Sequence, residues 1–232
     1  SNVTAPKNLF STPAGTKGTT VHSDYQLSFQ RYGDTFVLDK VYKGETEVES
    51  NLSKMTYMQS AWARPPAVGA PMYSNNFWPM DAEQGKDPHA GKGKTINFTN
   101  GTDVTTPVDN DDQLNYSSEE NAHNWYFGMR FSVKFKVGDY TGPMEYYFRG
   151  DDDFWLFIDG KLAVDIGGIH QVAGESINLR KWMEDNHKLG TDENGNPIDK
   201  NKEHTMDIFY MERGAWGSCC YLQFILPNTE VV

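Results

Sequence analysis

The sequence predicts a mostly all-β fold of antiparallel strands, and three observations support this. Aromatic residues make up 13% of the 232-residue chain (6 Trp, 12 Tyr and 13 Phe), and such side chains favour strands. Glycine and proline (21 Gly and 11 Pro) recur in clusters between apolar runs, which is typical of tight turns. Several of these runs alternate between apolar and polar residues, as half-buried strands do.

The composition also excludes some classes of function. The formal net charge is −11, so the chain has no electrostatic attraction to nucleic acid or to an anionic membrane surface. No apolar run approaches the length of about 18 residues that a membrane-spanning helix needs, so membrane insertion is not expected.

Two neighbouring cysteines, Cys219 and Cys220, are the only ones in the chain, and their spacing does not fit a zinc site. Adjacent residues of a strand point to opposite faces, so we expect one thiol in the core and the other outside it. A strained vicinal disulfide is the alternative.

The first strands are expected soon after an irregular arm. Residues 1–20 are polar and rich in Thr, Gly and Pro, which predicts an arm without regular structure. Residues 25–32 and 35–41 alternate on either side of Gly33-Asp34, and this arrangement predicts a hairpin.

A single domain is expected over residues 21–228. Within it, residues 50–124 are rich in proline, glycine and acidic residues, which predicts a loop-rich insertion. The apolar run Phe77–Met80 is expected to anchor this insertion. Residues 229–232 are expected to begin a linker to a following domain.

Strand patterns are clearest from residue 125 onward. Residues 125–137 alternate, with Phe131, Val133, Phe135 and Val137 on one face. Residues 144–150 continue the strand character, and a further hairpin is expected around Asp159-Gly160, the residue pair that tight two-residue turns favour. Asp159 and Gly160 are therefore interpreted as structural turn residues.

The C-terminal third is expected to hold short elements. Residues 174–189 predict a strand followed by a helical turn, and residues 204–227 predict a closing hairpin around Gly214–Gly217. Residues 191–203 contain an Asp-x-Asn-Gly run that resembles the start of a calcium loop. Because Pro197 lies inside it and no flanking helices are evident, a solvated hairpin tip is the preferred interpretation.

Three consecutive acids, Asp151, Asp152 and Asp153, precede one of the most apolar strands. Neighbouring carboxylates repel each other unless they share a proton or bind a cation. Ca²⁺ accepts six to eight oxygen ligands in irregular geometry, so it suits this loop best. A solvated loop and an acid–base catalytic pair are the alternatives, and catalysis is disfavoured because no nucleophile or base constellation is visible.

Several segments together resemble the fibro-slime branch of the PA14 superfamily, as it occurs in sortase-anchored surface proteins and pilus-tip adhesins of Gram-positive bacteria. The resemblance covers roughly residues 70–228, with a weaker match in residues 22–44. It is carried by FRGDDDFWLFIDGKLAVDIGGIH, HTMDIFYMERGAWGSCCYLQFILP, NFWPMD and HNWYFGMRF.

This resemblance implies a PA14-like antiparallel β-sandwich with long loops and short helical turns. It also implies Ca²⁺ on Asp151 and Asp152, with Asp153 standing where the family pattern has glycine. A second calcium loop of the family falls on residues 212–220, but residues 214–217 contain no Asn or Asp. Backbone carbonyls, Ser218 or waters would have to replace those ligands.

The residues expected to contact the ligand follow from the same resemblance. They belong to the second loop: Trp216, Arg213, Glu212 and Gly214. An exposed tryptophan in such a loop can stack on a sugar or anchor a protein. Asp165 is expected to brace the site, most simply through a hydrogen bond to backbone.

The expected function is that of an extracellular, calcium-dependent adhesin domain, anchored to a Gram-positive cell wall beside further domains of the same surface protein. It would bind carbohydrate or a host glycoprotein, because a vicinal diol can replace two waters on a loop-held calcium ion. The alternative is a structural tip or stalk domain, or a protein–protein interaction domain, in which calcium only stiffens a loop. We do not expect an enzyme.

Overall fold

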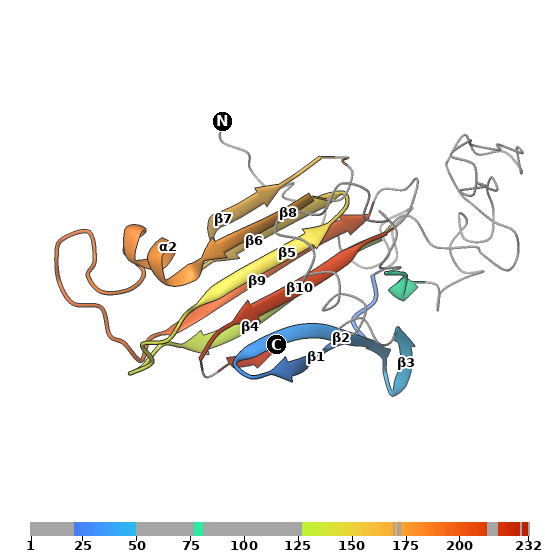
Figure 1. Ribbon diagram of the computed structural model, residues 1–232, viewed down its shortest axis with the longest axis horizontal. Coiled ribbons are helices and arrows are strands. Elements are labelled where there is room, and N and C mark those ends of the chain that lie inside the picture. The colour runs from blue at the N-terminus through green and yellow to red at the C-terminus, as the bar shows by residue number, and fades with distance from the viewer. Residues whose placement is uncertain are drawn as a thin grey trace, which may run out of the picture.

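Two antiparallel sheets pack face to face in the computed structural model (Figure 1). The structure describes residues 21–49, 77–80, 127–168, 170, 173–212, 218–227 and 229–231. The expected antiparallel β-sandwich is thereby confirmed, and the expectations for residues 1–20 and for most of 50–124 lie outside the described residues.

The first sheet has the strand order β1-β2-β10-β5-β8, with β3 paired to β2. Its strands are β1 (Tyr25–Tyr32), β2 (Thr35–Lys43), β3 (Thr46–Glu49), β5 (Glu145–Gly150), β8 (Ala173–Asn178) and β10 (Cys220–Ile225). The expected N-terminal hairpin is confirmed: Gly33, at φ +61°, allows the tight turn between β1 and β2. Through β2 and β10 this hairpin becomes part of the sandwich.

The second sheet has the strand order β11-β4-β9-β6-β7. Its strands are β4 (Phe127–Lys136), β6 (Asp153–Ile158), β7 (Lys161–Ile166), β9 (Glu203–Glu212) and β11 (Thr229–Val231). The expectation of a linker at residues 229–232 is wrong for the first three of them, because β11 pairs with Val133–Phe135 of β4.

The hairpin between β6 and β7 is confirmed. Asp159 and Gly160 both have positive φ angles, +48° and +76°, as a tight two-residue turn requires. After β8 the chain forms α2 (Leu179–Asp185), where the Asn178 side chain accepts a hydrogen bond from the backbone N–H of Lys181 and caps the first turn.

The core lies between the sheets and is filled by alternate residues of each strand. Val133 and Phe135 of β4 are fully buried, as their alternation predicts. Phe148 of β5 stacks on Phe154 of β6, with ring centroids 3.9 Å apart, and so joins the two sheets. Phe77 is also fully buried in this core, which confirms the expected apolar anchor.

The expected closing hairpin is wrong, because β9 and β10 belong to different sheets. β9 pairs with β4 and β6, whereas β10 pairs with β2 and β5. Two apolar runs joined by a glycine-rich loop look alike whether the loop turns back or crosses to the opposite sheet, so sequence spacing alone did not distinguish these arrangements.

Both cysteines are buried and carry free thiols, so no vicinal disulfide is present. Cys220 faces the core as part of β10, but Cys219 is only 1% exposed, so the expectation of a thiol outside the protein interior is wrong for it. Burial raises the pKa of Cys219 to about 12, which leaves its thiol protonated at neutral pH.

The Asp192 turn agrees with the interpretation as a solvated tip. The Asp192 carboxylate accepts hydrogen bonds from the backbone N–H groups of Asn194 and Asn196, so it closes its own turn. Glu203, the twelfth position of a would-be calcium loop, is already the first residue of β9 and lies 3.7 Å from Lys134.

Candidate ligand-binding site at the sheet crossover

The three acids lie where the chain passes from one sheet to the other. β5 ends at Gly150 in the first sheet and β6 begins at Asp153 in the second, so only Asp151 and Asp152 make the crossing. Asp152 has a φ of +56°, a left-handed conformation that Asp adopts more readily than most residues.

The end of β9 and the start of β10 lie at the same end of the sandwich. Asp153 pairs with Met211 in the second sheet, and Gly150 pairs with Cys220 in the first. The crossing from β5 to β6, the end of β9 and the start of β10 are therefore neighbours in space, although about 60 residues separate the crossing from the end of β9 in the chain (Figure 1). The corner that they form is called the crossover corner below.

Asp151 ties the crossing from β5 to β6 to Cys219, the residue before β10. Its carboxylate accepts a hydrogen bond from the Cys219 backbone N–H at 2.5 Å, and its own N–H donates to the Cys219 carbonyl at 3.2 Å. Burial raises the pKa of Asp151 to about 7; the hydrogen bond from Cys219 opposes this shift, and the charge of Asp152 adds to it. Without a nearby cation, the negative charge of Asp151 is thus disfavoured.

Asp153 points in a different direction. Phe154 and Leu156 face the core, so Asp153 and Trp155 face the outer side of the second sheet. Gly167 and Gly168, which follow β7, lie on that side, where the Gly168 N–H donates to the Asp153 carboxylate at 2.6 Å. The structure therefore gives Asp153 the role of holding the chain at Gly168, just after β7, apart from the other two acids.

The same stretch of chain explains Asp165 and Trp155. The Asp165 carboxylate accepts from the Gly167 N–H at 3.1 Å, the backbone hydrogen bond expected from the sequence. A Cβ atom at Gly167 would lie 3.1 Å from the Trp155 ring, so glycine is what allows the chain to cover the indole. Trp155, only 6% exposed, is packed under this stretch.

Glu212 and Ser218 lie in the interior beside Asp151. Glu212 is 2% exposed and accepts a hydrogen bond from the Tyr210 hydroxyl at 3.1 Å, while Ser218 Oγ lies 3.2 Å from that hydroxyl. Burial raises the pKa of Tyr210 well above its usual range, and the charges of Glu212 and Asp151 raise it further. Glu212, expected to contact the ligand from an exposed loop, is instead part of this buried network.

His170 is a further neighbour of the acids, and its direction could not be derived from the sequence. Its charge lowers the pKa of Asp151, so it lies close to the crossover corner, and its Nε2 is 3.4 Å from the Ile166 carbonyl. No signal in the sequence connects the two positions, because β6 and β7 separate them along the chain.

The donor set at the crossover corner suits a hard cation only in part. Asp151 and Asp152 offer carboxylate oxygens, the ligands that Ca²⁺ prefers. Among the described residues, however, no group of three or more His, Cys, Asp or Glu side chains is arranged to hold a metal ion. The other residues expected at the site, Arg213, Gly214 and Trp216, lie outside the described residues.

The fold and the acidic crossover together define an antiparallel β-sandwich domain with a compact polar corner at one end. The PA14 domain family matches residues 75–228, more than half of the chain, and the chain therefore belongs to this family. PA14 domains are associated with the binding of carbohydrate or protein. The hairpin of β1 and β2 precedes the matched region, although it is paired into the first sheet.

Similar curated proteins come from the eukaryote Dictyostelium discoideum. Protein psiI is 34% identical over 149 residues, covering 64% of this chain, and protein psiJ is 33% identical over 148 residues, covering 63%. The matches span only 15% and 16% of the lengths of these relatives. The expected anchoring to a Gram-positive cell wall is contradicted, because these relatives have a eukaryotic source.

Among solved structures, a GH31 alpha-xylosidase from Xanthomonas citri matches 61% of this chain and 14% of its own, with 9% identity and a TM-score of 0.23. A superposition at this score supports no conclusion about fold or function. In the part of the chain that the structure describes, no helix has the length and apolar character to cross a membrane.

Proposed function

We propose that this PA14 domain is a calcium-dependent carbohydrate-binding module, in which Asp151 and Asp152 hold the ion at the crossover corner. The observation that carries the proposal is the placement of two consecutive acids, one of them 3% exposed, at a backbone crossing fixed by hydrogen bonds to Cys219. A bound cation would supply the positive charge that stabilises both carboxylates in their ionised form.

The electrostatics of Asp151 support this proposal. With a pKa of about 7, this buried carboxyl is partly protonated at neutral pH. A divalent cation nearby would favour the ionised form, so ion binding and proton release would be coupled. The rigid hydrogen-bonded backbone keeps the carboxylate in place before the ion arrives, which reduces the entropy lost on binding.

The chemistry of recognition would then come from the ion. A loop-held calcium ion keeps positions for external oxygens, which two neighbouring sugar hydroxyls can fill. The buried Tyr210–Glu212–Ser218 network would support the corner without touching the sugar. The expected ligand contacts of Trp216, Arg213 and Gly214 stay predictions.

A second candidate is a protein–protein interaction or structural domain in which calcium, if it binds, stiffens the crossover corner. The composition of residues 214–217, Gly-Ala-Trp-Gly, favours it, because this stretch offers no side-chain oxygen to an ion. Under both proposals the domain binds a partner and catalyses no reaction.

Calcium titration followed by thermal unfolding tests the ion, with EDTA as the reference and Asp152→Asn as the variant. Asn tolerates the left-handed backbone, so the variant keeps the fold. When the free calcium concentration is a hundred times the dissociation constant, binding raises the free energy of unfolding by about 2.7 kcal/mol. This raises Tm by roughly 5–10 °C in a domain of this size. Asp34→Asn, on the exposed β1–β2 turn, serves as the control and should behave like the wild type.

A glycan array then separates the two candidates. Carbohydrate binding that requires calcium and disappears in Asp152→Asn supports the first. A calcium-dependent rise in Tm without binding to any glycan supports the second. If Tm is the same in calcium and in EDTA, the ion site does not exist and the proposed function fails.

A further inference from the structure

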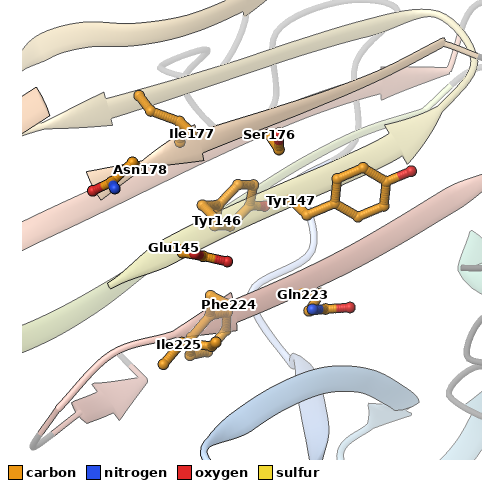
Figure 2. Close-up of a pocket in the computed structure, with 9 residues that line it drawn as sticks. All are labelled: Glu145, Tyr146, Tyr147, Ser176, Ile177, Asn178, Gln223, Phe224 and Ile225. Carbon is orange, nitrogen blue, oxygen red and sulfur yellow. The ribbon is translucent and has the colours of Figure 1, made fainter. Parts of the chain in front are cut away.

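The outer face of the first sheet holds a hollow that is separate from the crossover corner. Three neighbouring strands, β8, β5 and β10, form its floor, and its volume is about 160 Å³. Figure 2 shows Tyr147 between Ser176 on one side and Gln223 on the other, with its ring extending away from Glu145. Tyr147 precedes Asp151 by four residues of extended chain, which corresponds to about 13 Å.

The register of the sheet brings these side chains together. Tyr147 pairs with Ser176 of β8 and with Gln223 of β10, so the three form one row across the sheet. Glu145 lies two residues earlier on the same face of β5, because side chains two apart in a strand share a face. A carboxylate, an amide, a hydroxyl group and an aromatic side chain thus share this face of the sheet.

The side chains of Tyr147 and Gln223 are held in defined positions. The Tyr147 ring makes an edge-to-face contact with Tyr221, with centroids 5.6 Å apart. The Tyr221 hydroxyl donates to the Gln223 side-chain carbonyl, so the NH₂ group of that amide is the part available for donation to a ligand. A Cβ atom at Gly174 would lie 3.2 Å from the Tyr147 hydroxyl, so glycine leaves room for this ring.

These groups match a neutral sugar ring. The Glu145 carboxylate accepts hydrogen bonds from hydroxyl groups, and the Gln223 amide donates to hydroxyl oxygens. The Tyr147 ring supplies a flat apolar contact with a polar hydroxyl at its end. Among the residues that line the hollow Glu145 is the only charged one, and none is Lys, Arg or His, so a neutral sugar suits it better than an anionic one. An ammonium ligand offers only donors and would leave the Gln223 amide without an acceptor.

We propose that this hollow is a second carbohydrate subsite, which binds one neutral saccharide unit without calcium. It stands independently of the ion at the crossover corner, because none of its lining residues belongs to that corner. The volume is small compared with the range of about 300–1,000 Å³ for typical ligand pockets, so one ring fits it better than a folded peptide segment.

Saturation-transfer NMR in EDTA tests the subsite, with the methyl glycosides of glucose, galactose, mannose and xylose as probes. We expect transfer to at least one glycoside. Glu145→Gln keeps the shape of the side chain but removes its charge, and should weaken that binding about tenfold or more. Tyr147→Ala should abolish it, while Glu193→Gln, on an exposed turn, should leave it unchanged.

The remaining outcomes are equally definite. Thermal unfolding shows whether each variant is folded. If Tyr147→Ala is not folded, the Glu145→Gln variant alone tests whether the hollow binds the glycoside. Binding that persists in Asp152→Asn supports a subsite distinct from the ion. No transfer to any of the four glycosides, equal transfer in Glu145→Gln, or loss of transfer in Asp152→Asn would each overturn the inference.

Discussion

Gly150→Ala is the substitution that most directly tests the geometry of the crossover corner. A Cβ atom at this position would lie 2.2 Å from the backbone carbonyl oxygen of Cys219 and 2.5 Å from the Phe148 ring. The φ angle of Gly150 is not positive, so conformational strain is not the reason for glycine here. The reason is the close approach of β10, whose Cys220 pairs directly with Gly150.

The expected cost follows from what must move. The Cys219 carbonyl has to retreat by about 1 Å to reach an ordinary contact, and it accepts the Asp151 N–H. Losing that hydrogen bond costs about 1 kcal/mol, and weakening the charge-assisted bond from the Cys219 N–H to the Asp151 carboxylate costs about 1–2 kcal/mol. Overpacking against Phe148 adds about 1–3 kcal/mol. We therefore expect a loss of about 3–6 kcal/mol in the free energy of unfolding.

Urea unfolding followed by tryptophan fluorescence measures this loss, and Gly174→Ala is a graded comparison. At Gly174 the nearest atoms to an added Cβ lie at 3.2 Å, including the Phe148 carbonyl oxygen, so the cost there should stay below about 1.5 kcal/mol. A Gly150→Ala variant as stable as the wild type, or less affected than Gly174→Ala, would show that β5 and β10 do not approach each other as described.

Two further substitutions test buried polar contacts. Burial by itself would raise the pKa of Asp159, but hydrogen bonds from His204 and Thr205 outweigh it and hold the pKa below its usual value. Asp159→Asn should therefore lower the free energy of unfolding by about 1 kcal/mol at pH 7. The difference from the wild type should vanish as pH falls below about 4, because Asp159 then becomes protonated. A difference in urea unfolding that does not depend on pH would contradict this. Tyr210→Phe removes a buried hydroxyl that is hydrogen-bonded to Glu212, and should lower the free energy of unfolding by about 1–3 kcal/mol in the same assay. An unchanged urea concentration at the unfolding midpoint would show that this hydroxyl does not stabilise the fold.

The strands could be predicted because their signals are local. Alternation gave the face of β4 that is buried, and Asp159-Gly160 gave the hairpin of β6 and β7, since both depend on residues within a few positions of each other. The partner of each strand is a different matter. β9 and β10 follow each other in the chain but lie in opposite sheets, and that choice depends on the packing of the whole core.

The same limit applies to the site. The row of acids could be read from the sequence, because three carboxylates before a buried strand are conspicuous. Which acids act together could not, because Asp151 turns toward β10 and Asp153 toward the connection after β7. The burial of Glu212 was also missed, since a carboxylate beside a glycine-rich loop is usually exposed and its partner hydroxyl on Tyr210 has no distinctive spacing.

The structure also supplies a reason for the crowded acids that does not require a metal ion. A chain that crosses between sheets in two residues leaves backbone N–H groups of neighbouring segments without strand partners, and buried N–H groups need acceptors. Asp151 accepts from Cys219 and Asp153 accepts from Gly168, so each has a structural role with or without calcium. Substituting either would disturb the fold in both cases. Asp152→Asn is the sharpest test of the calcium proposal, because Asn has nearly the same shape and can keep the left-handed backbone while removing the charge.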